Sequence, residues 1–168
     1  MSNASPIAMT GALAPRESWV ARQCSVERAL QVIHTRSAFL ILREAYYGAT
    51  RFDEFSRRAR LSEPVTATRL RELVAAGLMV REPYQEPGQR TRDRYRLTDM
   101  GAELLPVLVA LMQWGDRWLQ EDGAPVALRH SGCGEPVTAQ LRCDAGHQVE
   151  PGELDLVRAA PAAGVLSP

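Results

Sequence analysis

Apolar residues recur with helical spacing in the first half of the chain. After a polar start, Ser25 can cap a helix that reaches Ile33, and the following segment, 38–47, is almost entirely apolar. A helix that is apolar on most sides is buried on most sides, so 38–47 is expected to form the centre of the core. Gly48 is then expected to end it.

Two shorter helical segments follow, joined by a tight turn. Phe52, Phe55 and Ala59 have the spacing of one helical face, and Ser62 is a favourable N-cap for a second helix that Gly77 ends. The predicted inward face of this second helix carries Thr66, Leu70, Leu73 and Val74, and the opposite face carries Pro64, Thr68, Arg71 and Ala75. Two closely joined helices, the second with a small and polar outward face, predict a helix-turn-helix.

A β-hairpin is predicted directly after this helix pair, where it would form a wing. The segments 78–84 and 92–97 have the residue types of short strands, and Pro87-Gly88 between them signals a turn. Alternation along the second strand places Arg92, Arg94 and Arg96 on one face and Tyr95 and Leu97 on the other.

From Thr98 to about Glu121 the pattern is that of a long helical stretch with apolar residues on more than one face. A small winged domain offers such a helix one surface, so the second apolar face is expected to contact another copy of the chain. Pro106 should kink or split the helix near Leu105. The residues assigned to the dimer contact are Leu104, Leu108, Leu111, Met112, Trp114 and Trp118.

These elements predict a mainly α fold with a small β-hairpin, an α+β winged helix-turn-helix domain with a long C-terminal dimerisation helix. We expect a flexible N-terminal segment at 1–20, the DNA-binding and dimerisation domain at 21–122, and a small C-terminal appendage at 123–168. No apolar run approaches the roughly 20 residues that a membrane helix needs, so no membrane partner is expected. A reducing cytoplasm is the expected location, because three scattered cysteines do not form a disulfide scaffold.

Charge is distributed unevenly along the chain. The 20 basic residues, all arginine, balance 20 acidic ones, so net charge alone gives no reason to expect nucleic-acid binding. Residues 51–96 nevertheless carry 11 Arg against 7 acids, whereas 97–168 carry 4 Arg against 10 acids. The segment that contains the helix-turn-helix and the wing is therefore where an anionic partner is expected.

Double-stranded DNA is the partner that this combination predicts. Arg69 or Arg71 can form a bidentate pair with guanine, although each could instead pair with Glu72 or Glu63. Arginines on the wing can contact phosphate or the minor groove, or can simply form the polar face of an exposed ribbon. The candidate DNA-contacting residues are Arg51, Ser62, Pro64, Thr68, Arg69, Arg71, Arg90, Arg92 and Arg94.

Several short motifs in unbroken order over residues 22–120 strengthen this interpretation. They are Cys24 before the first helix, Arg51-Phe52, Arg69-Leu70-Arg71-Glu72-Leu73, Gly77-Leu78 and Leu97-Thr98-Asp99-Met100-Gly101. Together they resemble the HxlR family of bacterial transcription regulators. The resemblance implies a winged helix-turn-helix that binds DNA as a homodimer, with the terminal helices forming the dimer contact.

The resemblance departs from the family pattern in two places. The Gly-Lys-Trp that is usual before the second helix is replaced around Ile33-His34-Thr35-Arg36-Ser37, and the recognition helix opens with Ser62-Glu63-Pro64-Val65-Thr66. The second departure shifts the usual proline by one position and places Thr66 where a leucine is usual, which weakens any inference of an inherited operator sequence. Some members also use the cysteine matched by Cys24 to sense oxidants or electrophiles. Arg22, Arg28 and the nearby helix N-terminus would favour its thiolate, while a small buried residue is the alternative.

The appendage contains two pairs of metal-ligating residue types. His130 and Cys133 form one pair, and Cys143 and His147 form the other, which are the ligand types of a tetrahedral zinc site. Zinc is the cofactor that such a cluster would bind. A degenerate ribbon without metal, or a disulfide between Cys133 and Cys143, are the alternatives.

Two other functions remain open. A Cys/His pair could serve an enzyme, but the sequence contains no Gly-rich phosphate loop, nucleophile elbow or paired carboxylates, so we expect no enzymatic activity. A winged helix used only for protein contacts would not need the arginine-bearing wing. Salt-sensitive DNA binding would separate both from the favoured interpretation. A small-molecule or oxidant effector is a further expected partner.

Overall fold

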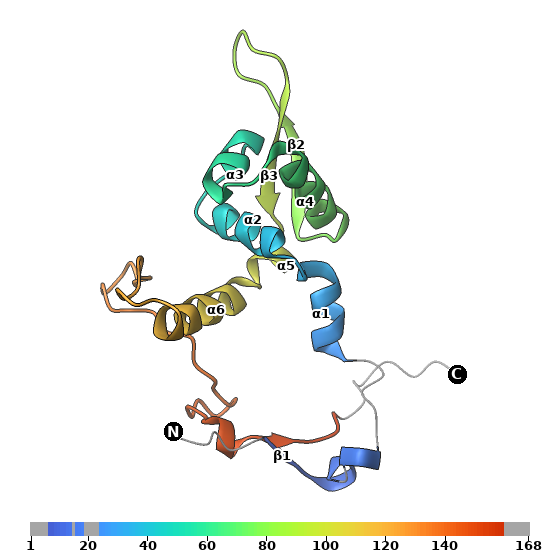
Figure 1. Cartoon of the computed structure of the whole chain (residues 1–168), viewed down its shortest axis with the longest axis vertical. Coiled ribbons are helices and arrows are strands. Elements are labelled where there is room, and N and C mark those ends of the chain that lie inside the picture. The colour runs from blue at the N-terminus through green and yellow to red at the C-terminus, as the bar shows by residue number, and fades with distance from the viewer. Residues whose placement is uncertain (1–6, 15, 19–23, 160–168) are drawn as a thin grey trace. The chain divides into compact units, whose positions relative to one another are not determined.

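The computed structural model describes residues 7–14, 16–18 and 24–159, which belong to two compact units. One unit comprises Cys24–Ala139, and the other combines the segment up to Gln23 with the segment from Gln140 onward. Figure 1 labels the helices and strands of the larger unit and one strand of the smaller unit. The larger unit thus continues beyond the boundary at residue 122 that the sequence suggested.

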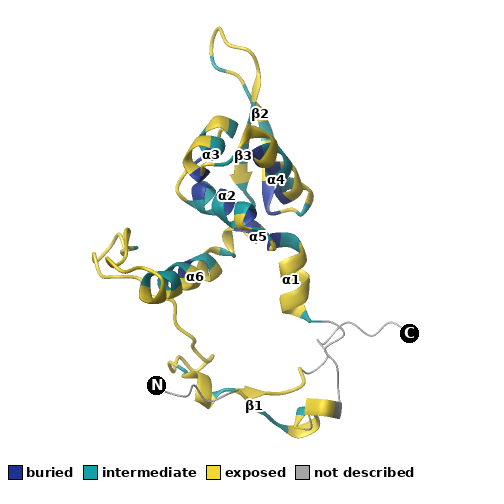
Figure 2. Ribbon diagram, in the orientation of Figure 1, coloured by how far each residue is buried: buried dark blue, intermediate teal, exposed yellow. Residues whose placement is uncertain are grey.

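Three helices form the core of the larger unit: α2 (Arg36–Tyr46), α3 (Phe52–Ala59) and α4 (Glu63–Ala75). The α2 helix contacts both α3 and α4, and Figure 2 shows buried residues concentrated where these helices meet. Ile41 of α2 is completely inaccessible to solvent. The expectation that the apolar segment after residue 38 forms the centre of the core is confirmed.

The helix ends follow local signals in the sequence. Thr35 caps α2, because its Oγ1 accepts a hydrogen bond from the amide of Ala38 at 3.1 Å. The turn between α3 and α4 passes through Arg60, which has a φ of 54°, and Ser56 Oγ donates to the carbonyl of Leu61 at 2.8 Å. The α1 helix (Ser25–Ile33) begins one residue earlier than predicted, so Cys24 rather than Ser25 is its N-cap.

The wing is the predicted antiparallel hairpin of β2 (Met79–Tyr84) and β3 (Arg92–Leu97). Its register pairs Met79 with Leu97 and Tyr84 with Arg92. The amide of Tyr95 donates to the carbonyl of Thr50, before α3, at 2.7 Å. The ring of Tyr95 also meets Phe55 edge-on, with 6.3 Å between ring centroids. These contacts join the base of the wing to the helical core.

Two helices, α5 (Asp99–Ala102) and α6 (Leu105–Trp118), occupy the stretch predicted as one long helix after Thr98. Pro106 is the second residue of α6, which confirms that the proline splits the stretch near Leu105. Neither these helices nor any other in the described part of the chain is long and apolar enough to span a membrane.

The α5 helix approaches the backbone of Leu78 closely at Gly101. A Cβ atom at this position would lie 2.1 Å from the carbonyl oxygen of Leu78. The hydroxyl of Tyr46 donates to the carbonyl of Gly101 at 2.5 Å, and burial raises the pKa of Tyr46, so this donor stays protonated. Glycine is therefore required for α5 to contact the start of the wing.

The smaller unit contains short elements only. Its β1 (Ala8–Met9) pairs in parallel with β4 (Asp155–Leu156), so part of the segment expected to be flexible takes part in a strand pair. The other elements are the 3-10 helices η1 (Gly11–Leu13), η2 (Arg16–Ser18) and η3 (Pro151–Glu153).

Replacing Gly101 by alanine should lower the free energy of unfolding by about 1–3 kcal/mol, because the new methyl group collides with the Leu78 backbone. Gly115→Ala is the matched control, since open space surrounds a Cβ there, and it should raise stability by about 0.5–1 kcal/mol as a helix-interior substitution. Urea unfolding measures both variants. Equal stabilities would contradict the close contact at Gly101.

Candidate nucleic-acid interface

Burial of one side of α4 determines which of its residues face away from the core. Thr66, Leu70 and Leu73 are buried, and Thr66 Oγ1 donates to the carbonyl of Ser62 at 3.0 Å. The predicted contact residues on the outward side are Ser62, Pro64 and Arg71, which are exposed, and Thr68, which is half-buried. Neither an ion pair nor a side-chain hydrogen bond engages Arg71 within the described residues. The helix therefore presents one unpaired cation at its outward side.

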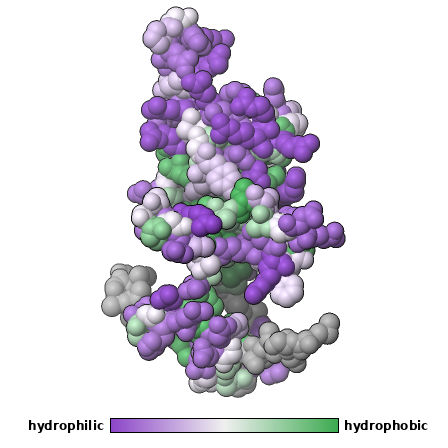
Figure 3. All heavy atoms as spheres, turned by 90° about the vertical axis from the view of Figure 1, so that its left-hand side faces the viewer, coloured by the Kyte–Doolittle hydropathy of each residue, from purple (hydrophilic) through white to green (hydrophobic). Residues whose placement is uncertain are grey.

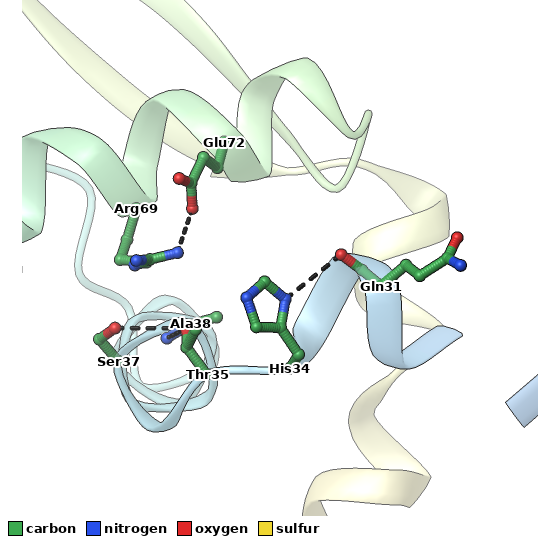
Figure 4. Close-up of polar contacts among 7 residues, drawn as sticks. All are labelled: Gln31, His34, Thr35, Ser37, Ala38, Arg69 and Glu72. Atoms are coloured by element: carbon green, nitrogen blue, oxygen red, sulfur yellow. Dashed lines mark hydrogen bonds and ion pairs between the residues drawn. The ribbon is translucent and has the colours of Figure 1, made fainter. Parts of the chain in front are cut away.

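Arg69 lies on a different side of α4 from Arg71, because two residues along an α-helix correspond to a rotation of about 200°. Its guanidinium pairs with Glu72, and its Nε is buried without a hydrogen-bond partner among the described residues. Figure 4 shows this side chain directed toward Ser37 at the start of α2. The structure thus places Arg69 away from the outward side, contrary to its predicted grouping with Arg71. The pairing with Glu72 that the sequence left open is the one observed.

The turn before α4 adds arginines that the sequence analysis did not include. Arg57, in the last turn of α3, and Arg60, in the turn itself, are exposed and have no side-chain partner among the described residues. Arg58 instead pairs with Glu54 at 3.0 Å. The signal was present in the sequence as three arginines within positions 57–60, immediately before the predicted recognition helix.

Ion pairs neutralise part of the charge of the wing. Arg94 Nε lies 2.9 Å from Glu82, its cross-strand neighbour, and Arg81 pairs with Asp93 at 2.5 Å. The hydrogen bond and charge of Asp93 raise the pKa of Arg81. The guanidinium of Arg94, predicted as a DNA contact, is therefore already paired with an acid on the opposite strand.

Other arginines of the wing remain unpaired. The side chains of Arg90, Arg92 and Arg96 are exposed, and no ion pair or side-chain hydrogen bond to another described residue holds them. Alternation along β3 exposes Arg92, Arg94 and Arg96, as predicted. Figure 3 shows hydrophilic residues covering the wing end of this unit. Such a surface can attract an anionic polymer through several cations at once.

Arg51 is held between the wing and the start of α3. Its guanidinium pairs with Glu86 and lies 5.3 Å from the ring centroid of Tyr84. The charge of Glu86 is the main cause that raises the pKa of Arg51. The amides of Thr50 and Arg51 donate to Glu54 Oε2 at 2.9 and 3.0 Å, and these bonds lower the pKa of Glu54. Glu54 therefore fixes the backbone from which Arg51 projects.

The predicted dimer residues divide between two sides of α6. Leu111, Trp114 and Trp118 are 49%, 55% and 67% exposed. Leu104 packs against the core of its own chain, and Leu108 and Met112, together with Leu111, line a cavity beside α2. Val107, which was not predicted, is exposed beside the first group. The exposed apolar residues Val107, Leu111, Trp114 and Trp118, which we call the α6 stripe, lie along one side of the helix, and the predicted dimer contact at α6 stays a prediction.

Cys24 is half-buried at the N-cap of α1. The exposed side of this helix carries Val26 and Leu30, which are 66% and 50% exposed. The sensing role of Cys24 remains a prediction. Of the two residues that would favour its thiolate, Arg22 lies outside the described residues, and Arg28 is exposed.

The residues predicted to form a zinc site are divided between the two units. His130 Nδ1 lies 3.1 Å from Cys133 Sγ in the larger unit, whereas Cys143 and His147 belong to the smaller one. Across 7–14, 16–18 and 24–159, no three His, Cys, Asp or Glu residues form a group that could hold a metal ion. Structural zinc requires four ligands at about 2.0–2.3 Å, so zinc binding by these residues stays a prediction. The alternative Cys133–Cys143 disulfide is also not formed.

Comparison with known proteins agrees with the helix-turn-helix and its wing. Residues 32–123 match a family model described as HxlR-like helix-turn-helix. The chain is 43% identical over 120 residues to Rv3095 of Mycobacterium tuberculosis, an uncharacterized HTH-type transcriptional regulator, and the match covers 71% of this chain and 75% of the relative. An HTH-type regulator of Methanothermobacter thermautotrophicus is 38% identical over 93 residues, with 55% of this chain and 70% of the relative covered.

Solved structures extend the likeness beyond that segment. PA1607, a candidate transcription factor, is 36% identical with a TM-score of 0.73, and the alignment covers 82% of this chain and 96% of that one. PA1374 from Pseudomonas aeruginosa is 34% identical with a TM-score of 0.60, covering 84% and 96%. The oxidized redox regulator HypR is 30% identical with a TM-score of 0.51, and covers only 56% of this chain. The first two therefore match residues outside the helix-turn-helix as well.

The hydrogen bonds that the Glu54 carboxylate accepts from the amides of Thr50 and Arg51 make a pH-dependent contribution to stability. Because its pKa is lowered in the folded state, the contribution is complete above the unfolded-state pKa of about 4.3 and is lost as the pH falls through the folded-state value. We expect Glu54→Gln to destabilise the protein at pH 7 and the difference from the parent protein to shrink below about pH 4.3. Urea unfolding at a series of pH values measures this difference. A constant difference would show that the carboxylate charge is not involved.

Proposed function

Since this chain belongs to the HxlR-like helix-turn-helix family of transcriptional regulators, we propose that it acts as a homodimer on an inverted-repeat DNA operator. The observation that carries the proposal is the outward side of α4, where exposed Arg71 has no partner among the described residues. An arginine in this position can donate two hydrogen bonds to the O6 and N7 atoms of guanine in the major groove. Ser62, Pro64 and Thr68 on the same side would contact DNA around it.

The wing and the turn would supply contacts to the DNA backbone, which do not depend on the base sequence. Arg90 and Arg92 on the wing, and Arg57 and Arg60 at the turn, are unpaired cations among the described residues and would bind phosphate. Arg51 and Arg94 are held by acids, so each would have to leave Glu86 or Glu82 to contact DNA. Phosphate contacts orient the protein, and the α4 side chains then provide the sequence preference.

The α6 stripe supports a homodimer. Its residues recur at intervals of four, three and four, which aligns them along one side of the helix. Exposed indole and leucine side chains of this size favour burial at about 25 cal/mol per Å². Two-fold symmetry would place two α4 helices in successive major grooves, which requires an operator with half-sites about one helical turn apart.

Regulation through Cys24 remains part of the proposal. The thiol lies at the N-terminal end of α1, whose exposed apolar residues Val26 and Leu30 would join the dimer contact. An oxidant or electrophile that modified Cys24 would therefore act beside that contact. HypR, one of the similar proteins, is itself a redox regulator.

Preference for the protein's own upstream DNA over random duplex at moderate salt tests the proposal directly. A winged helix used only for protein contacts would bind neither duplex at any salt concentration. DNA binding through phosphate contacts would instead weaken as salt rises. A footprint on the upstream duplex would define the operator. Equal affinity for both duplexes would contradict sequence-specific regulation.

Arg71→Ala should weaken operator binding by about 1–3 kcal/mol and relax the preference at one base position. Arg92→Ala should weaken binding to operator and random duplex alike and flatten the dependence of affinity on salt. Fluorescence anisotropy with both duplexes at several salt concentrations separates the two effects.

Arg69→Ala is the control for Arg71, because Arg69 lies on the other side of α4. It should leave the base preference unchanged, whatever it does to stability. A loss of base preference in Arg69→Ala and not in Arg71→Ala would reverse the proposed orientation of α4.

Leu111→Glu combined with Trp114→Glu should convert a dimer into monomers, since two charges per chain would have to be buried at the contact. Met100→Glu is the control, because Met100 is equally exposed but lies on α5 outside the α6 stripe. Sedimentation at micromolar concentration measures the mass of each species. A monomeric parent protein, or a double variant that remains dimeric, would contradict the proposed contact.

A further inference from the structure

A cavity of about 500 Å³ lies within the larger unit between α2, α6 and the segment that follows α6. Its volume is within the range of about 300–1,000 Å³ that is typical of small-molecule sites. Most of its wall is apolar, and the apolar or aromatic side chains of Phe39, Leu40, Tyr47, Leu108, Leu111, Met112 and Val126 are among those that line it. The cavity is therefore large enough, and apolar enough, to hold the body of a small organic molecule.

The charged groups of the cavity leave one negative charge without a counterion. Glu44 is only 5% exposed, and its Oε1 lies 2.9 Å from Nε of Arg43, so these two lining residues neutralise each other. Asp116 of α6 is half-buried, and no ion pair or side-chain hydrogen bond to another described residue engages it. A ligand that covered Asp116 without supplying a positive charge would remove a carboxylate from water uncompensated.

We propose that this cavity binds an apolar molecule carrying a single positive charge, such as an organic ammonium or phosphonium ion. Asp116 would neutralise the charge, and the rings of Phe39 and Tyr47 would add the attraction of an aromatic face for a cation. The surplus carboxylate disfavours an organic anion of the same size. A neutral molecule would leave Asp116 covered and unpaired.

The position of the cavity connects its occupant to DNA binding, and this part of the inference rests on the proposed function. The α6 helix lines the cavity with Leu108, Leu111, Met112 and Asp116, and Leu111 is at the same time part of the exposed α6 stripe. On the other wall, α2 contacts α4 directly. A ligand that changes the placement of α6 against α2 would therefore change how the two α4 helices of a dimer are spaced. The ligand would act as an effector.

Tetraphenylphosphonium and tetraphenylborate provide a direct test, because they have nearly the same size and shape and opposite charge. Isothermal titration calorimetry of the full chain should show saturable binding of the phosphonium and at least tenfold weaker binding of the borate. Asp116→Asn should weaken phosphonium binding at least tenfold. Asp122→Asn is the matched control, since Asp122 is an exposed acid after α6 that does not line the cavity, and it should change nothing.

A second variant keeps the test valid if Asp116→Asn folds poorly. Met112→Trp should fill the cavity and abolish phosphonium binding while the thermal unfolding transition remains cooperative. Equal affinity for the two ions, undiminished binding in Asp116→Asn or Met112→Trp, or an equal loss in Asp122→Asn would overturn the site. No phosphonium binding by the parent protein would overturn it as well.

Operator affinity tests the regulatory part separately. Saturating phosphonium should shift the dissociation constant of the parent protein for its upstream duplex severalfold and leave that of Asp116→Asn unshifted. A phosphonium that binds without such a shift would overturn the effector role. Duplex binding measured without phosphonium reports on the proposed DNA-binding function alone. A failure of the DNA-binding proposal is therefore distinguishable from a failure of the effector proposal.

Discussion

Burial of the Thr66, Leu70 and Leu73 side of α4 is the constraint on which the rest of the interface depends. Leu70 and Thr66 are completely inaccessible to solvent, and Leu73 is nearly so. Rotating α4 about its axis would expose these side chains, each large apolar one at a cost of about 1.5–3 kcal/mol. The rotation is therefore fixed, and with it the outward position of Arg71 and the inward position of Arg69.

The α2 helix connects α4 to other elements of the unit by direct contact. It contacts α3, α4 and α6, and Tyr46 near its end binds the carbonyl of Gly101 in α5. A change at α6 thus reaches α4 through one intervening element. Small shifts between closely packed helices produce discrete rearrangements, because closely packed interiors do not deform continuously. This is the physical basis on which a ligand between α2 and α6 can affect α4.

Local signals in the sequence were sufficient to predict most of the fold. Helical spacing identified α2 and α4, Pro106 located the break before α6, and alternation identified the exposed arginines of β3. The same signals could not resolve which arginines remain unpaired. Arg94 meets Glu82 only because of the hairpin register. Arg69 and Glu72 are neighbours on the surface of α4 through their i,i+3 spacing, and the sequence left this pair open beside a pair with Glu63. Residue types alone predicted the zinc site, and matching ligand types does not by itself bring four residues within bonding distance of one metal.

The orientation of α4 is best tested by arginine modification with phenylglyoxal in the presence and absence of operator DNA, read out by mass spectrometry. DNA should protect Arg71, Arg90 and Arg92, which are exposed and unpaired among the described residues, and leave the low reactivity of Arg69 unchanged. Protection of Arg69 together with undiminished modification of Arg71 would contradict the account.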